Sequence, residues 1–245
     1  MFKKEYIINR ILAISDIHGC GKTFIKLLKQ IKFNKTDKLY LLGDLVDRGP
    51  NTKLLIDQIL KLKAEGYLIE KLMGNHEELM LNSVISDSDQ ERWLRNGGRE
   101  TLESFGVTNY NELEQQYKLF FKSMLLKAEV DNYIFVHAGI NNLQFKDPFL
   151  PSVVLWTRNW YEFLDYKWLG NRYVIHGHTA QTQLDIEIQF HNFEEKRVLN
   201  LDAGCCYTKT YLLKSKSQNT KPELGKLCCV DLTNRKLYFE DNCEL

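Results

Sequence analysis

Short apolar runs alternate with segments of helical periodicity in the N-terminal part of the chain, and this alternation constrains the fold more than any other feature. Branched and apolar residues predict strands at 10–15, 38–42 and 67–73. Between them, apolar residues at helical spacing predict helices around 24–31 and 54–62, and Gly66 can end the second helix. Strand, helix, strand, helix, strand predicts right-handed βαβ units and therefore a parallel sheet.

The rest of the chain predicts a helical insertion followed by more strands. Residues 76–126 are mainly helical in pattern, with a break at Asn96-Gly97-Gly98. Further strands are expected at 133–136, 153–155, 173–175, 186–190, 198–201, 211–213, 226–230 and 236–239. From 186 onward these runs predict a second, largely antiparallel sheet packed on the first, with a hairpin loop at 215–222. Because the sequence contains no linker and no repeat, we expect one α/β domain spanning 1–245.

The charges nearly cancel, with 33 Lys and Arg against 32 Asp and Glu. Such a chain has no overall field to attract nucleic acid or an anionic membrane, so we expect neither as a partner. No apolar run is long enough to span a membrane, and Asn9 and Arg10 interrupt the first one too early for a signal peptide. Six cysteines without a CxxC zinc pattern are typical of a reducing compartment and predict a cytoplasmic protein. The sequence leaves the oligomeric state open.

Polar residues follow the predicted parallel strands. The densest block is Gly43-Asp44-Leu45-Val46-Asp47-Arg48-Gly49, which by itself also fits an ordinary turn. Comparable side chains after the other strands are Asp16, His18, Asn75, His76, His137, His176 and His178. The carboxyl ends of parallel strands meet at one edge of a sheet, so these side chains should converge. Carboxylate, imidazole and amide ligands without thiolate suit manganese, iron or zinc, and the sequence therefore predicts a metal site.

These blocks resemble, in order, the signature of the phosphoprotein phosphatase family within the calcineurin-like metallophosphoesterases. The matching blocks are Asp16-x-His18-Gly19, Gly43-Asp44-x-x-Asp47-Arg48-Gly49, Gly74-Asn75-His76-Glu77, His137-Ala138-Gly139 and Gly177-His178-Thr179. They run from about residue 10 to residue 180, and Leu201-Asp202-Ala203-Gly204-Cys205 is similar to the closing strand of the family. Two further stretches, Trp93-Leu94 with Asn96-Gly97-Gly98 and Trp156-Thr157-Arg158, are most similar to the small bacterial and bacteriophage lambda phosphatase branch.

The resemblance implies a fold and a metal centre. The fold would be a β-sandwich of two mixed sheets flanked by helices, in four layers ordered α/β/β/α. Two divalent metal ions, manganese by preference and iron or zinc as alternatives, would share Asp44 as a bridging ligand. Asp16 and His18 would hold the first ion, and Asn75, His137 and His178 the second.

The resemblance also implies catalytic roles. A hydroxide bridging the metals would attack phosphorus directly, so no phosphoenzyme is expected. Arg48, Arg158 and Asn75 would hold the phosphoryl group, the arginines as bidentate donors. His76 would be the general acid for the leaving group, with Asp47 as its carboxylate partner.

Three residues depart from the family pattern or stay ambiguous. Ser15 replaces a glycine that usually precedes the first aspartate, which is tolerable because this position supplies no ligand. His176 stands where the family usually has an apolar residue or arginine, so we leave it outside the metal shell. Asp202 fits a strand-end residue as well as a site residue.

Three functions compete on this evidence. The first is a serine/threonine protein phosphatase acting on phosphorylated proteins or peptides, favoured by Asp47, by Glu77 and by the block at 156–158. The absence of a second histidine after His178 also favours a phosphomonoesterase. The alternative is a symmetrical diadenosine tetraphosphate hydrolase, whose sequences resemble the same blocks. The remote alternative is a phosphate-binding or scaffold protein without catalysis.

Overall fold

The computed structural model describes residues 8–207 and 224–244. The strands are β1 (Arg10–Ile14), β2 (Asp37–Leu41), β3 (Leu68–Lys71), β4 (Lys127–Val130), β5 (Tyr133–Val136), β6 (Tyr173–His176), β7 (Val198–Asn200), β8 (Lys226–Asp231) and β9 (Lys236–Asp241). The α-helices are α1 (Gly21–Gln30), α2 (Thr52–Ala64), α3 (Asn75–Asn82), α4 (Asp87–Trp93), α5 (Arg99–Phe105), α6 (Gln115–Lys122), α7 (Pro151–Trp156), α8 (Tyr166–Leu169), α9 (Gln183–His191) and α10 (Phe193–Lys196). A π-helical turn, η1 (Leu94–Gly98), and two 3-10 turns, η2 (Tyr110–Glu112) and η3 (Trp160–Phe163), complete the set within the described residues.

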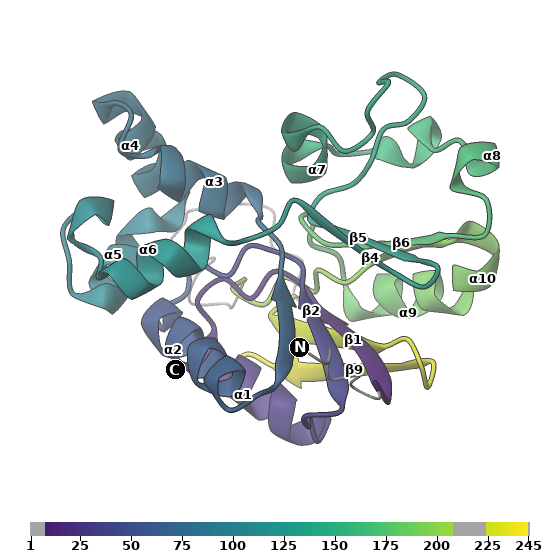
Figure 1. Ribbon diagram of the computed structural model, residues 1–245, viewed down its shortest axis with the longest axis horizontal. Coiled ribbons are helices and arrows are strands. Elements are labelled where there is room, and N and C mark those ends of the chain that lie inside the picture. The colour runs from purple at the N-terminus through teal and green to yellow at the C-terminus, as the bar shows by residue number, and fades with distance from the viewer. Residues whose placement is uncertain (1–7, 208–223, 245) are drawn as a thin grey trace, which may run out of the picture.

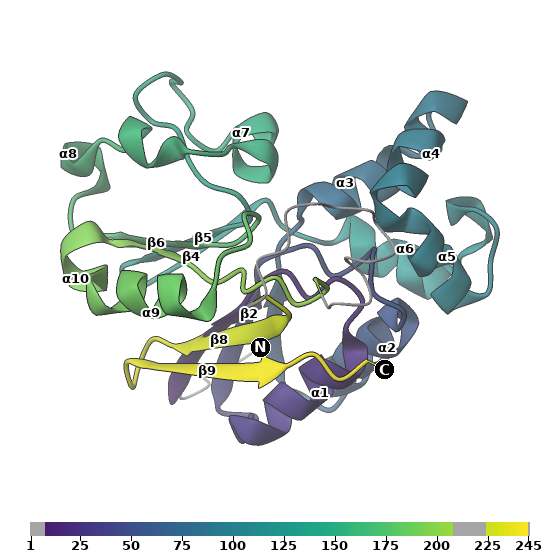
Figure 2. The ribbon, with the colours of Figure 1, turned by 180° about the vertical axis from the view of Figure 1, so that it is seen from behind.

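The first sheet has the strand order β3-β2-β1-β8-β9. β1, β2 and β3 are parallel, as the βαβ pattern predicts, and α1 and α2 make the crossovers. β8 and β9 join the same sheet in antiparallel orientation beside β1 (Figure 2). The prediction that the C-terminal strands form a separate second sheet is therefore wrong. Both strands form where they are predicted, but β8 is buried on both faces instead of alternating, and the local pattern does not reveal which distant strand is the neighbour.

The second sheet has the order β4-β5-β6-β7, with β4 antiparallel to β5 and the other pairs parallel. Two predicted strands are wrong, because 153–155 lies in α7 and 186–190 lies in α9. Pro151 starts α7, and Thr182 caps α9 by accepting from the backbone N–H of Asp185. Short apolar runs fit a buried helical turn as well as a strand, so their ends decide between the two. The predicted strand at 211–213 and loop at 215–222 lie outside the described residues.

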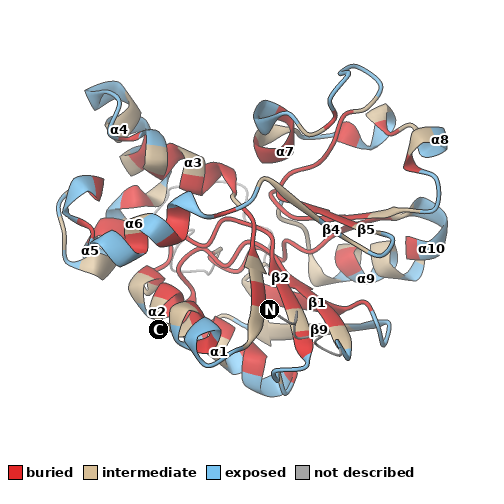
Figure 3. Ribbon diagram, viewed as in Figure 1, coloured by how far each residue is buried: buried red, intermediate tan, exposed pale blue. Residues whose placement is uncertain are grey.

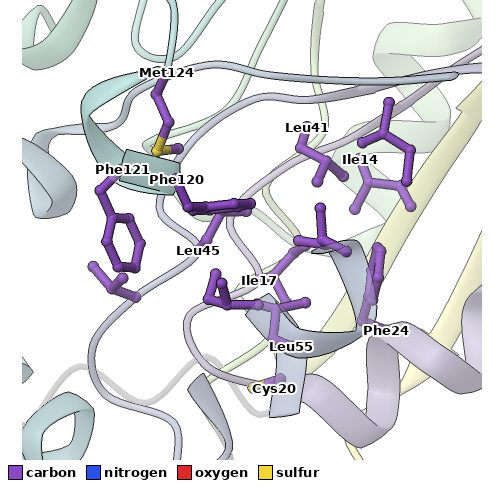
Figure 4. Packing of buried hydrophobic residues seen from close by; sticks show 14 of the residues in the cluster. Ile14, Ile17, Cys20, Phe24, Leu41, Leu45, Leu55, Phe120, Phe121 and Met124 are labelled. Carbon is purple, nitrogen blue, oxygen red and sulfur yellow. The ribbon is translucent and has the colours of Figure 1, made fainter. Parts of the chain in front are cut away.

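Three apolar clusters separate the layers. The cluster on the outer face of the first sheet packs Leu12, Ile14 and Leu41 against α1, α2 and α6, and includes Phe24, Leu55 and Phe121 (Figure 4). The cluster between the sheets joins Ala13, Tyr40, Phe135, Ile175 and Val230. The third covers the other face of the second sheet with α7, η3 and α8. The four-layer order α/β/β/α and the mixed sheets are thus confirmed (Figure 1).

The helical insertion between β3 and β4 lies on one side of the strand ends, and α7 lies on the other (Figures 1 and 2). Its predicted break is present, since Gly97 has a φ of +107° inside η1. Among the described residues, the structure contains no helix long and apolar enough to cross a membrane. The loops that follow β1, β2 and β5 are buried between these flanking helices (Figure 3), and they carry the predicted site residues.

Candidate metal centre

The loops at the strand ends have unusual backbone conformations. Six non-glycine residues there have a φ between +44° and +73°, namely Asp16, His18, Asp44, Asp47, Arg48 and His178. The left-handed region costs a side-chain-bearing residue on the order of 1–3 kcal/mol, so it persists only where the surroundings impose it. All six belong to the predicted metal or phosphate site. The strain is thus concentrated where the sequence predicts function.

Asp44 lies at the middle of the site, and Glu77 holds its loop in place. The Glu77 side chain is fully buried and accepts four backbone N–H groups, from Asp44 at 2.9 Å, Leu45 at 2.7 Å, Val46 at 3.2 Å and Gly74 at 2.8 Å. Gly74 must be glycine, because a Cβ there would lie 2.1 Å from Asp44 Oδ1. These contacts fix the direction of the Asp44 carboxylate.

One group of donors surrounds Asp44 Oδ1. His137 Nε2 lies 3.4 Å from this oxygen, 2.9 Å from Asn75 Oδ1 and 3.1 Å from His178 Nδ1. His178 Nδ1 also lies 2.9 Å from Asn75 Oδ1. The other nitrogen of His137, Nδ1, contacts the Leu42 carbonyl oxygen at 2.8 Å. Each of these four side chains is buried, and the structure brings together every residue predicted for the second metal.

The chemistry of this donor set fits a cation. A carbonyl oxygen only accepts, so His137 Nδ1 carries the proton and, in the neutral ring, Nε2 presents a lone pair. That lone pair faces the carbonyl oxygen of the Asn75 side chain, and the Nε2 atom lies 3.1 Å from His178 Nδ1. Lone pairs that converge in this way repel each other unless a proton or a cation lies between them. His178 Nδ1 faces His137 Nε2 and Asn75 Oδ1, so it is the ligand atom that the geometry offers. The other ring nitrogen of His178, Nε2, is buried without a hydrogen-bond partner among the described residues.

A second group of donors lies on the other side of Asp44. His18 Nε2 is 3.5 Å from Asp44 Oδ2, and its Nδ1 contacts the Val46 carbonyl oxygen at 2.9 Å. A backbone carbonyl on the far ring nitrogen is the usual outer contact of a metal-bound histidine. His18, Asp44 and His76 offer ligand atoms within 4.8 Å of one another, and so do Asp44, His137 and His178. Asp44 is common to both groups, which is the geometry of a bridging ligand.

Asp16 is buried beside these groups. Its carboxylate accepts the backbone N–H of His178 at 3.0 and 3.1 Å and a hydrogen bond from the Ser15 hydroxyl. Burial, with the charges of Asp202 and Asp44, raises the pKa of Asp16 well above its usual range. Three carboxylates that repel one another favour a bound cation, which would reverse this shift.

Burial favours the neutral form of three of the histidines, His18, His137 and His178. Burial lowers the pKa of His137, lowers that of His18 well below its usual value, and lowers that of His178 to about 2. Burial alone would raise the pKa of the Asp44 carboxyl, but the four surrounding histidines bring it well below its usual range. Neutral imidazole and ionised carboxylate are the protonation states that bind metal.

His76 and Asp47 form a buried pair next to the donors. His76 Nδ1 donates to Asp47 Oδ2 at 2.7 Å, which leaves Nε2 directed toward the Arg48 guanidinium at 2.9 Å. The other contacts of Asp47 come from the helical insertion: Trp93 Nε1 donates at 2.9 and 3.1 Å, and the Thr101 hydroxyl donates at 2.8 Å. The pKa of His76 is raised, because Asp44 and Asp47 outweigh the effect of burial.

The two predicted phosphate-binding arginines differ in how they are held. The Arg48 backbone N–H donates to the Gly97 carbonyl oxygen at 3.1 Å, and its guanidinium contacts His18 Nε2 at 2.8 Å and lies 5.5 Å from the Tyr207 ring. Arg158 is exposed, and its Nη1 donates to the Thr179 hydroxyl at 2.9 Å. Arg48 is therefore fixed by its surroundings, whereas Arg158 is held by the segment that follows His178.

Other residues named from the sequence have structural contacts. His176 points away from the donors, with Nε2 2.9 Å from the Tyr161 hydroxyl. Asp202 is buried near the site, and burial raises its pKa to about 6. Trp156 donates from its indole to Glu78 at 2.5 Å, which links α7 to α3.

Reasoning from the sequence missed the role of three residues. Glu77 was used to infer the substrate, although its carboxylate serves the Asp44 loop. Trp93 was noted only as part of a resemblance, and Thr101 was not considered, although both bind Asp47. The glycine-rich break at 96–98 was the available signal, because a glycine kink in an insertion often marks a functional contact.

A family model for calcineurin-like phosphoesterases matches residues 9–194. The chain is 33% identical over 129 residues to a symmetrical bis(5'-nucleosyl)-tetraphosphatase from Nitrosomonas europaea. This alignment covers 52% of this chain and 44% of that protein. It is 36% identical over 107 residues to serine/threonine-protein phosphatase 1 from Salmonella typhimurium, which covers 40% of this chain and 47% of that protein. Each alignment thus spans less than half the length of the curated relative.

Among solved structures, a putative diadenosine tetraphosphatase superposes on the chain with a TM-score of 0.64. The superposition covers 96% of this chain and 94% of that one, at 16% sequence identity. A likeness at such low identity establishes a common fold. Substrate choice depends on the site, because one fold serves many activities.

Proposed function

The chain belongs to the calcineurin-like phosphoesterase family, and from this premise we propose that it is a metal-dependent phosphomonoesterase acting on phosphoserine and phosphothreonine in proteins. The observation that carries the catalytic part is the convergence of two donor groups on Asp44. Two divalent cations, by preference Mn²⁺, would supply the nucleophilic hydroxide and neutralise the charge that develops on the phosphoryl oxygens.

The phosphoryl group is held by side chains at the rim of the donors. Arg48 offers a planar guanidinium that already lies between His18 and His76, so a phosphate there meets a fixed bidentate donor. Arg158 offers a second guanidinium, and Asn75 offers its amide N–H groups. Holding the group in one orientation, with the leaving oxygen toward His76, lowers the entropic cost of the displacement.

The leaving group needs a proton, and His76 can deliver it. Nδ1 is committed to Asp47, and Nε2 lies 2.9 Å from Arg48 Nη2, a donor, so Nε2 accepts from the guanidinium in this structure. When Arg48 turns to the phosphoryl group, Nε2 of the charged ring can carry the proton that moves. Asp47 stabilises that charged ring, and the raised pKa of His76 favours it near neutral pH. When the P–O bond breaks, the Nε2 proton passes to the departing alkoxide and leaves His76 neutral.

The case for a protein substrate rests mainly on Arg158 and its neighbours. Glu77 holds the Asp44 loop, and Asp47 orients the proposed acid His76. Hydrolysis of either substrate would need both roles, so these residues do not distinguish the candidates. The block at 156–158 is different, since Trp156 ties α7 to α3 and places Arg158 at the rim. An exposed arginine beside the centre suits a phosphorylated side chain presented by a protein surface.

A symmetrical dinucleoside tetraphosphate hydrolase is the second candidate. The Nitrosomonas relative carries that name, and the superposed structure is titled a putative diadenosine tetraphosphatase. Arg48, Asn75 and the donors around Asp44 would serve an anhydride as well as an ester. The candidates therefore differ in what lies beyond the phosphoryl group.

The test compares both substrates on one preparation. Metal-stripped protein is assayed with and without Mn²⁺ on a phosphothreonine peptide and on diadenosine tetraphosphate. Faster manganese-dependent release of phosphate from the peptide supports the proposal. Faster hydrolysis of the dinucleotide would instead support the second candidate, the dinucleoside tetraphosphate hydrolase, with the same metal centre. A protein that binds manganese and turns over neither these substrates nor p-nitrophenyl phosphate is a phosphate-binding or scaffold protein, and the proposal is refuted.

A further inference from the structure

A cavity of about 170 Å³ lies next to Arg158, on the side of the second donor group. Its lining comes from η3 and the residues before it, from β6, β7 and α9, and from the segment after His178, and it includes Arg158, Tyr161, His176, Gln181, Gln189 and Asn200. None of these except Arg158 has a part in the catalytic proposal. Because Arg158 lines the cavity and is also a predicted phosphate ligand, a substrate bound there can extend from the phosphoryl group into the cavity.

Two side-chain carboxamides of the wall, those of Gln181 and Gln189, form a closed ring of hydrogen bonds with the backbone of Asn200. The Asn200 backbone N–H donates to Gln189 Oε1 at 3.0 Å, Gln189 Nε2 donates to Gln181 Oε1 at 2.9 Å, and Gln181 Nε2 donates to the Asn200 carbonyl oxygen at 3.0 Å. Each carboxamide nitrogen carries two N–H groups, and each oxygen has two lone pairs. The ring therefore fixes the orientation of the carboxamides and leaves capacity for further hydrogen bonds.

The rest of the wall is aromatic and uncharged. Tyr161 is 42% exposed, and its hydroxyl lies 2.9 Å from Nε2 of the buried His176. Among the described residues that line the cavity, Arg158 at the rim is the one that carries a charge. A charged group from a ligand would lose its hydration there without a partner of opposite sign deep in the cavity.

We infer that this cavity is a substrate subsite for a flat, uncharged group that carries both hydrogen-bond donors and acceptors, the chemistry of a nucleobase. The inference rests on the phosphoesterase activity proposed above, and a nucleobase in the cavity would favour the dinucleotide of the second candidate as the substrate. Paired donor and acceptor atoms of glutamine and asparagine match the edge of adenine. Tyr161 supplies an aromatic ring of the kind on which bases stack. A carboxamide side chain next to a phosphorylated residue is the other source of the same chemistry, although it lacks an aromatic face.

The experiment uses Gln181→Met, which keeps the length of the side chain and removes its polar atoms. Gln183→Met is the matched control, because Gln183 lies on α9 and bonds to Glu187 outside the cavity. The metal-loaded proteins are assayed on diadenosine tetraphosphate, on a phosphothreonine peptide with a neighbouring asparagine, and on p-nitrophenyl phosphate, whose ring carries no hydrogen-bond donor to pair with the carboxamides. Thermal unfolding and metal content check that each variant is folded and loaded.

The subsite predicts that Gln181→Met raises KM for the dinucleotide about tenfold, the effect of one or two lost hydrogen bonds, and leaves p-nitrophenyl phosphate unchanged. ADP should also inhibit the wild type more strongly than pyrophosphate does, and the variant should lose this difference. A rise in KM confined to the asparagine peptide keeps the subsite and identifies its occupant as a carboxamide. Equal effects on all three substrates, or none, would overturn the inference. Failure of the metal-loaded wild type to hydrolyse any of the three substrates would instead refute the proposed function.

Discussion

Trp93 is predicted to act on the reaction through Asp47 without touching the substrate. Its indole N–H donates to both Asp47 oxygens, and the Thr101 hydroxyl donates to Oδ1, whereas the His76 ring binds Oδ2. Trp93→Phe removes one of these donors and keeps an aromatic ring in a fully buried position. The carboxylate can then turn away from His76, and the imidazole loses the partner that orients it.

The size of the effect follows from the contact that is lost. A hydrogen bond to a buried charged group contributes about 1.5–3 kcal/mol, which corresponds to roughly 10- to 100-fold if all of it is expressed in the transition state. The loss should appear in kcat, because Trp93 does not contact the phosphoryl group. It should also depend on the leaving group, since an alkoxide needs the proton of His76 more than p-nitrophenolate does.

The assay measures kcat and KM on a phosphothreonine peptide and on p-nitrophenyl phosphate. We expect Trp93→Phe to lower kcat on the peptide about tenfold or more, and on the aryl ester less than about threefold, with unchanged metal content. Trp168→Phe is the control, since Trp168 packs with Phe149 and Arg172 outside the site. An equal fall on both substrates, or a folded variant with no fall on either, would refute the positioning role.

Four other substitutions give separable outcomes. Glu77→Gln leaves two of the four backbone N–H groups without an acceptor, which costs about 1–3 kcal/mol each. The metal-loaded variant should therefore unfold at a clearly lower denaturant concentration than wild type, whereas Glu103→Gln, at an exposed position, should unfold at the same concentration. Asp44→Asn should lose bound metal, whereas His76→Asn should keep metal and lose rate on poor leaving groups; equal metal contents and equal rates would contradict both roles. His176 has a pKa lowered to about 3 by burial, so its stabilising contribution is complete above the unfolded pKa of about 6.5 and is lost as pH falls below it. The difference in unfolding free energy between wild type and His176→Gln should therefore shrink by roughly 2 kcal/mol from pH 7.5 to pH 5, measured by denaturant titration, and a constant difference would argue against a neutral buried ring.

The convergence of the strand-end side chains could be predicted from the sequence because its signal is local. Glycines, aspartates and histidines directly follow strands whose apolar pattern is clear, and parallel pairing brings them to one edge. The helices at 151–156 and 183–191 were not predicted, because runs as short as theirs fit a strand or a helix equally well. The residues that start these helices, Pro151 and Thr182, are single residues and give only a weak signal in the sequence.

Long-range contacts also could not be predicted from the sequence. β8 pairs with β1 across most of the chain, and the local pattern within either strand does not specify this partner. Trp93 and Thr101 reach Asp47 from 46 and 54 residues away, through an insertion whose path depends on the Gly97 kink. Contacts of this kind depend on tertiary packing, so periodicity and spacing cannot reveal them.

The central claim is that two donor groups share Asp44 and bind two metal ions that catalysis requires. The most direct measurement titrates the metal-stripped chain with Mn²⁺ while recording bound metal and p-nitrophenyl phosphate hydrolysis on the same samples. We predict two bound ions per chain, with activity that rises as the second site fills. Hydrolysis that survives complete removal of metal, or activity that is maximal with one ion bound, would contradict the claim.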